Sequence, residues 1–181
     1  MHRRFLLEKL SQHSPIDEHE AAMLLDIIDF VNRYPNCFER ELEVGHITGS
    51  AWIIDSDRSH ALLTHHRKLD RWLQLGGHSD GQANTLEVAL REGREESGLT
   101  ELRPLLDGAI FDVDVHLIPA RKQEPEHYHY DVRFLFEADR QAALTISDES
   151  HDLAWMSLDE IEAQSDDESI LRMVRKSRER V

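Results

Sequence analysis

One short segment constrains this chain more than any other: GGHSDGQANTLEVALREGREESGLT, residues 76–100. It places four glutamates between two glycine-marked turns, and three of them, Glu92, Glu95 and Glu96, stand at i, i+3 and i+4. Residues with these spacings share one face of an α-helix, so the three carboxylates are predicted neighbours that repel one another. Either water screens them on an exposed helix face, with help from nearby arginines, or a cation lies among them.

The same segment carries the boundaries of a helix. Asn84 is a favourable N-cap, and Glu87 follows three residues later as in a capping box. Gly98 is the glycine that commonly ends a helix, so we predict a helix from about Thr85 to Ser97. Carboxylate oxygens that converge on such a face suit Mg²⁺, which prefers oxygen ligands and keeps several waters and substrate phosphates.

The composition is that of an ordinary globular chain. Its 181 residues are 40% hydrophobic and 31% charged, which suits one domain. The net charge of 21 − 36 = −15 disfavours nucleic-acid polymers and anionic membranes as partners. No segment approaches the ~20 apolar residues of a membrane span. The single cysteine, Cys37, fits a reducing compartment, so we predict a cytoplasmic protein.

Helical patterns come first along the chain, and strand patterns follow. We predict a helical N-terminal extension over residues 1–40, broken at Ser14-Pro15 and ended near Tyr34-Pro35. Residues 41–181 are predicted as the main domain, which begins with a β-hairpin of His46–Asp55 and His60–His66. Four more elements are expected: strands at 109–118 and 127–137, and helices at 156–164 and 170–180. The order lacks a regular βαβ alternation, which favours an α/β fold with a mixed sheet and flanking helices.

The acidic helix and its turns resemble the signature of the MutT-like Nudix hydrolases, G-x5-E-x7-R-E-U-x-E-E-x-G-U, where U is aliphatic. From Gly77 onward, six further positions match in order and spacing: Arg91, Glu92, Glu95, Glu96, Gly98 and Leu99. Two positions depart, because Ala83 replaces the first glutamate and Gly93 replaces an aliphatic residue. With flanking segments that are also similar, the resemblance covers about residues 47–161. It implies a Nudix-type α/β/α sandwich.

The resemblance also implies an activity: a pyrophosphohydrolase that uses Mg²⁺ or Mn²⁺. The implied substrate is a nucleoside diphosphate-linked small molecule, such as an NTP or ADP-ribose. The implied metal ligands are the Gly76 carbonyl and the carboxylates of Glu92, Glu95, Glu96 and Glu149. One of these glutamates would deprotonate the attacking water.

Arg91 is implied to orient the carboxylates through a charge-assisted pair. In the family this arginine normally pairs with the acid that is replaced by Ala83 here. The replacement leaves the orientation of the site open, and Asp80 or Glu87 are the residues that would compensate.

A histidine-rich strand supplies candidates for substrate contact. In HYHYDVRFLFE (residues 127–137), His127, His129, Asp131 and Arg133 alternate with apolar residues and therefore share one face. The resemblance favours this face for substrate binding, with His127, His129 and Arg133 joined by His78 from the glycine turn. Two alternatives stay open: a zinc site of the two histidines and Asp131, or plain solvent exposure. His65 and His66, with Arg67 and Lys68, form a basic cluster that is a further candidate for phosphate contact.

Two other interpretations remain beside the hydrolase. A catalytically weak nucleotide-binding or sensing module is favoured by Ala83. An isomerase of the isopentenyl diphosphate type is disfavoured, because its chemistry needs a cysteine in the site and Cys37 precedes the domain. A homodimer through the N-terminal helices is also left open.

Overall fold

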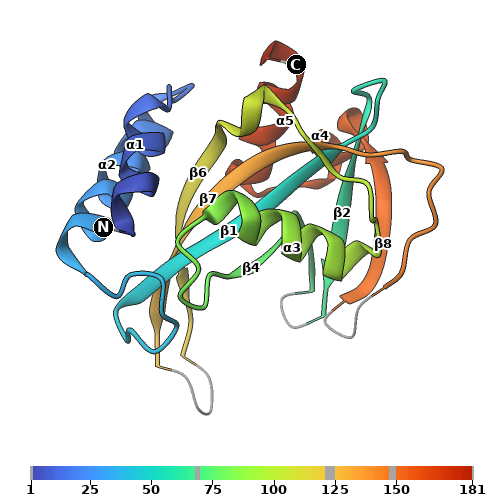
Figure 1. The fold of residues 1–181 in the computed structure, drawn as a ribbon. Helices are drawn as coiled ribbons and strands as arrows, with labels where there is room; N and C mark the ends of the chain where they lie inside the picture. Colours follow the sequence, from blue (N-terminus) through green and yellow to red (C-terminus); the bar gives the residue numbers. More distant parts are fainter. Residues whose placement is uncertain (1, 68–69, 121–124, 147–149, 181) are drawn as a thin grey trace.

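The computed structural model describes residues 2–67, 70–120, 125–146 and 150–180 (Figure 1). Two helices, α1 (Arg3–Gln12) and α2 (Glu18–Arg33), precede the sheet, as predicted. The break at Ser14-Pro15 is confirmed, but the cap of α2 is Asp17, whose carboxylate accepts the Glu20 amide at 2.7 Å. Among the described helices, none has the length and apolar character needed to cross a membrane.

The centre of the molecule is one curled mixed sheet. Its strands are β1 (Gly45–Ile54), β2 (His60–His66), β3 (Arg71–Leu73), β4 (Leu75–His78), β5 (Arg103–Pro104), β6 (Ile110–Ile118), β7 (His127–Glu137) and β8 (Ser150–Ser157). β1 is parallel to β7 over its whole length, from Gly45 opposite Tyr128 to Ile54 opposite Glu137, and the other described pairs are antiparallel. A short 3₁₀ turn, η1 (Leu106–Gly108), leads into β6.

The predicted hairpin forms, but its strands pair only at Ile53–Leu62 and Ile54–Ala61. The reason is that β4 occupies the first part of the same β1 edge, where it pairs with Thr48–Ala51. The strand β8 was not predicted, and it displaces the start of the expected 156–164 helix. That helix, α4 (Leu158–Gln164), begins instead at a capping box formed by Ser157 and Glu160.

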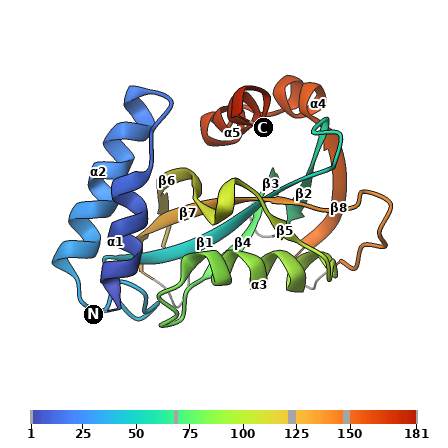
Figure 2. The ribbon, with the colours of Figure 1, turned by 45° about the horizontal axis from the view of Figure 1, so that its top comes forward.

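Helices cover both faces of the sheet, which confirms the α/β/α class. α3 (Thr85–Ser97) lies on one face, and α4 and α5 (Glu168–Arg180) lie on the other (Figure 2). α3 packs closely because Gly93 replaces a bulkier residue. A Cβ at Gly93 would lie 3.0 Å from Leu102 Cδ1 and 3.2 Å from Ala51 Cβ. The α1–α2 pair lies at the β6 edge of the sheet (Figures 1 and 2).

The two faces of the central strands differ in chemistry. The face toward α3 is apolar and includes Ile47, Ala51, Ile53, Val132 and Phe134. On the opposite face, the registers of β1, β7 and β6 align polar residues in successive rows. The first row is histidine, the next two are hydroxyl and charged residues, and the last contains Trp52 and Leu135 in the core beneath α5. This gradient of polarity places the candidate site at the histidine end.

Candidate active site

The glutamate helix forms one wall of the site. α3 spans Thr85–Ser97 and ends at Gly98, which has φ +74° and is therefore in the left-handed region that favours glycine, as predicted. The predicted side-chain cap is wrong, because Asn84 occupies the N-cap position but its side chain makes no capping hydrogen bond. Glu87 instead accepts a hydrogen bond from Gln82 at 3.2 Å.

The glutamates of α3 are held at the β4 edge by separate contacts. Arg91 donates to Glu92 Oε1 at 2.7 Å and to the His78 carbonyl at 3.0 Å. The Gly76 amide donates to Glu96 Oε2 at 3.3 Å. Glu95 is exposed and lines the adjoining cleft. The structure thus places Glu96 beside Gly76 and Glu92 beside Arg91 along the β4 edge, with Glu95 exposed on the same helical turn.

The glycine turn allows α3 to approach this edge. A Cβ at Gly77 would lie 2.5 Å from Glu92 Oε2, closer than real Cβ contacts allow. Only glycine therefore leaves room for the Glu92 carboxylate beside β4. The match of Gly77 to the start of the signature has this steric basis.

Neither Asp80 nor Glu87, the two expected substitutes for the acid missing at Ala83, forms the ion pair with Arg91. Arg91 forms an ion pair with its neighbour Glu92, at 2.7 Å. Asp80 instead forms a two-contact pair with Arg40, and Glu87 contacts Gln82. Hydrogen bonding from Arg40 also lowers the pKa of the Asp80 carboxyl.

A cleft of about 560 Å³ lies between this wall and the polar face of the sheet. Its lining includes residues of both walls: Gly76, Gly77, His78, Glu92 and Glu95 on one side, and Thr48, Ser50, His116, His127, His129 and Asp131 on the other. Arg40 and His66 border it as well. The predicted site residues His78, His127 and His129 are therefore beside the glutamate helix.

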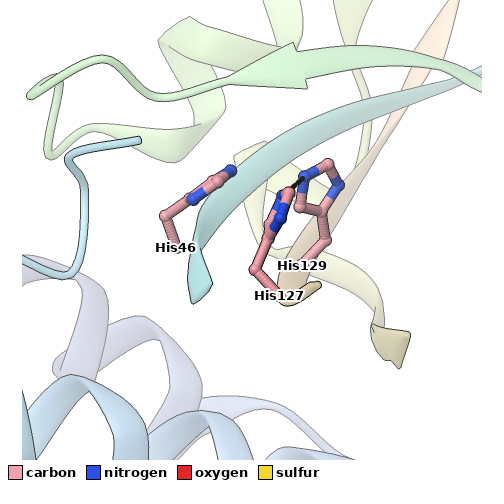
Figure 3. Close-up of side chains that lie close together, drawn as sticks. All are labelled: His46, His127 and His129. Atoms are coloured by element: carbon pink, nitrogen blue, oxygen red, sulfur yellow. Dashed lines mark hydrogen bonds between the residues drawn. The ribbon is translucent and has the colours of Figure 1, made fainter. Parts of the chain in front are cut away.

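The sheet wall of the cleft contains what we call the histidine row: His46 of β1, His129 of β7 and His116 of β6, which are paired in register. His127 lies two residues before His129 on the same face (Figure 3). His46 is only 3% exposed, and neither of its ring nitrogens has a hydrogen-bonding partner among the described residues. Burial and the neighbouring His78 and His127 lower the pKa of His46 to about 4. Burial and His116 lower the pKa of His129 to about 2, so both rings are neutral near pH 7.

Below the histidine row lies a buried ion-pair network of Glu20, Asp112, Asp114, Asp131, Arg133, Arg172 and Lys176. Asp112 accepts from Arg172 at 2.8 Å, from Lys176 at 2.8 Å and from Arg133 at 3.2 Å. Lys176 of α5 also pairs with Glu20 of α2. The network therefore ties the N-terminal helices and α5 to the centre of the sheet.

Arg133 belongs to this network rather than to the cleft surface. Its side chain is 2% exposed and contacts Asp112, Asp114 and Asp131 within 3.2 Å. A direct contact between Arg133 and substrate does not fit this position. Its neighbour Asp131 does line the cleft, where it accepts from Thr48 and Ser50 at 2.8 Å.

Some predicted residues fall elsewhere, and some site residues were not predicted. Glu149 and Lys68 lie outside the described residues. His65 stacks on Trp72, with ring centroids 5.1 Å apart. His46 and Arg40 were missed, since a lone histidine or arginine carries no spacing pattern. Knowledge that His46 of β1 pairs with His129 of β7 would have identified His46.

These observations define an α/β/α sandwich with a cleft between an acidic helix and a polar sheet. The family model described as the NUDIX domain matches residues 46–176. The chain therefore belongs to the NUDIX domain family, which confirms the resemblance found in the sequence. No curated protein matches the chain.

Solved structures share the fold at low identity. An Ap4A hydrolase from C. elegans has a TM-score of 0.57 and 18% identity, with 72% of this chain and 93% of that chain covered. The dihydroneopterin triphosphate pyrophosphohydrolase of E. coli has a TM-score of 0.56 and 13% identity, with coverages of 72% and 92%. The NUDIX domain of Shewanella oneidensis NrtR, complexed with ADP ribose, has a TM-score of 0.53 and 18% identity, with coverages of 84% and 96%.

Proposed function

We propose that this protein hydrolyses a phosphoanhydride bond of a small nucleotide-like substrate with the help of Mg²⁺ or Mn²⁺. The observation that carries the proposal is that the signature residues Gly77, Glu92 and Glu95 line the same cleft as five histidines, which include His78, His127 and His129. The family match supports a pyrophosphohydrolase activity. The substrate class is supported by similar folds, one titled an Ap4A hydrolase and one solved with ADP ribose.

The donors of the glutamate wall fit a hard divalent cation. Glu92, Glu95 and Glu96 supply carboxylate oxygens from one helical turn, and the Gly76 carbonyl is a further oxygen donor nearby. When bound, the ion would lower the pKa of a coordinated water and offset the charge that develops on the leaving phosphate. Glu149 stays in the proposal as a further ligand or base.

The other residues of the cleft position the substrate and the carboxylates. Arg91 holds the Glu92 carboxylate, and its contact with the His78 carbonyl anchors the helix to β4. His78, His127 and His129 line the cleft on the side where the phosphate groups of the substrate would bind. Arg133 acts from below, where its pair with Asp131 fixes a carboxylate in the cleft floor.

The test is a hydrolysis assay with NTPs, ADP-ribose and dinucleoside polyphosphates in the presence of Mg²⁺ or Mn²⁺. We expect release of phosphate or a mononucleotide from at least one class, and a loss of about 10²-fold or more in kcat for Glu95→Gln. Glu87→Gln is the matched control, because Glu87 is a glutamate of α3 that does not line the cleft. Equal activity in the two variants, or no turnover by the wild type, would refute the proposal.

A second function has one specific observation in its favour. Ala83 removes an acid of the signature, and Arg91 pairs with Glu92 itself. A nucleotide-sensing module would show tight binding of a panel member by calorimetry, with no product formed over hours. That combination of results would replace the hydrolase proposal with the binding one.

A further inference from the structure

The histidines of the sheet wall form a cluster separate in chemistry from the glutamates. Among the described residues, His46, His127 and His129 are the group of metal-ligating side chains whose donor atoms all lie within 4.8 Å of one another (Figure 3). Parallel pairing places His46 directly opposite His129, and the two-residue repeat places His127 on the same face. We infer that these three side chains bind a divalent transition metal ion, with Zn²⁺ the best fit.

The distance between two of the rings matches such a site. His127 Nε2 and His129 Nε2 lie 3.3 Å apart. Two imidazole nitrogens on one tetrahedral Zn²⁺ are also about 3.3 Å apart, because each Zn–N bond is about 2.0 Å. In a hydrogen bond between the rings, the lone pair of only one Nε2 atom takes part. A metal ion would use the lone pairs of both Nε2 atoms.

The tautomer of His127 is also the one that a metal requires. His127 Nδ1 lies 2.9 Å from the Pro125 carbonyl oxygen. Because a carbonyl oxygen only accepts, Nδ1 carries the proton and Nε2 of the neutral ring keeps its lone pair. A second hydrogen bond of this kind orients metal-binding histidines in proteins generally.

His46 supplies the independent observation. A buried imidazole with two unpartnered nitrogens costs free energy, since each polar group has lost water without gaining a partner. A metal ion among the three rings would provide a partner for one of these two nitrogens. The zinc interpretation of the sequence named Asp131 as the third ligand, but Asp131 accepts hydrogen bonds from Thr48, Ser50 and Arg133. His46 replaces it.

Three protein ligands leave a fourth tetrahedral position. His46 is buried and is not among the residues that line the cleft, whereas His127 and His129 line it. The open position therefore faces the cleft, where an anionic oxygen such as that of a phosphate group would bind. This is the arrangement of three-histidine zinc sites that keep one exchangeable ligand.

The first test measures metal content. Tag-free full-length protein is dialysed against Zn²⁺ and then against metal-free buffer, and zinc per chain is measured by mass spectrometry. We expect about one equivalent in the wild type and in His151→Ala, which removes an exposed histidine outside the cluster. We expect the affinity of His127→Ala for Zn²⁺, measured by competition with a chelating dye, to fall by about 100-fold or more. No bound zinc in the wild type, or equal affinity in His127→Ala, would overturn the inference.

The second test separates this site from the proposed hydrolase. Glu95→Gln should retain zinc and the visible bands of tetrahedral Co²⁺, even though it is expected to lose hydrolysis. If Glu95→Gln lost the metal as well, the ion would be at the glutamates and the histidine site would be refuted. A wild type that binds zinc but hydrolyses nothing would refute only the proposed function. Addition of inorganic phosphate should shift the Co²⁺ bands, and unchanged bands would contradict the open position.

Discussion

The histidine row and the ion-pair network lie on the same face of β1, β6 and β7, one directly below the other. They differ in whether their buried polar groups have hydrogen-bonding or ionic partners. In the network, Asp112 contacts three cationic side chains, and every member has an ion pair within 3.4 Å. In the row, His46 is equally buried and neither ring nitrogen has a described partner. The strand alignment that produces both regions is identical.

The difference indicates that the ion-pair network stabilises the fold, whereas the histidine row is a binding site that the fold positions. Buried charges that satisfy one another specify how α2, α5 and the sheet fit together. Buried polar atoms without partners lower stability, and native proteins keep few of them. His46, at the cleft end of this face, contributes two such atoms among the described residues, which indicates binding rather than structure. If this contrast is correct, substitutions in the two regions must have opposite effects on stability.

The largest effect is expected for Asp112→Ala in the network. The substitution leaves Arg133, Arg172 and Lys176 without their shared partner in a buried site. We expect the free energy of unfolding, measured in urea, to fall by about 3–5 kcal/mol. The exposed pair of Asp159 with Arg178 provides the control, and Asp159→Ala should change stability little. A fall of less than about 1 kcal/mol for Asp112→Ala would mean that the network is not structural.

Acid should weaken the network next, through Glu20. Burial alone would raise the pKa of this carboxyl, but hydrogen bonds from His13 and Lys176 outweigh burial and hold the pKa at about 2. A carboxyl with a lowered folded-state pKa stabilises the protein fully above its ordinary value of 4.5 and loses that contribution as the pH falls toward 2. The loss is on the order of 3 kcal/mol. We expect wild-type stability to decline more steeply over pH 4.5–2 than that of Glu20→Gln. Parallel pH profiles would contradict the role of Glu20.

The contrast between the two regions also explains what the sequence could and could not predict. The limits of α3, the glycine stop and the glutamate face follow from local spacing, and all were predicted correctly. The side of β7 shared by His127, His129, Asp131 and Arg133 follows from alternation and was also correct. These features depend on neighbours within a few residues.

Features that depend on pairing across the fold could not be predicted. Arg133 was expected at the substrate, but Asp112 and Asp114 come from β6, about twenty residues earlier, and bury its guanidinium. His46 becomes part of a cluster only because β1 runs parallel to β7 in one register. Register is set by the whole sheet, so neither the buried arginine nor the third histidine is visible in a local pattern.

Gly77→Ala tests whether the two walls of the cleft act independently. The added Cβ would meet the Glu92 carboxylate at 2.5 Å, and that end of a flexible side chain can move aside. We expect kcat to fall by about tenfold, or about 1.4 kcal/mol. The melting temperature should change little, and zinc bound at the histidines should be unaffected. A large drop in melting temperature with unchanged kcat would show that Gly77 serves the fold rather than the Glu92 position.

The smallest effect on the free energy of unfolding is expected for His46→Leu, which tests the contrast between the histidine row and the ion-pair network most directly. Without metal, leucine removes two unpartnered polar atoms from a buried position, so the free energy of unfolding should be unchanged or rise by up to about 1 kcal/mol. With Zn²⁺ added, the order should reverse, because the ion stabilises only a folded chain that binds it, by RT ln(1 + [Zn²⁺]/Kd). Urea denaturation of both proteins with and without Zn²⁺ measures the four values. A metal-free loss above about 2 kcal/mol would show that His46 has a structural partner, and the distinction between the row and the network would then fail.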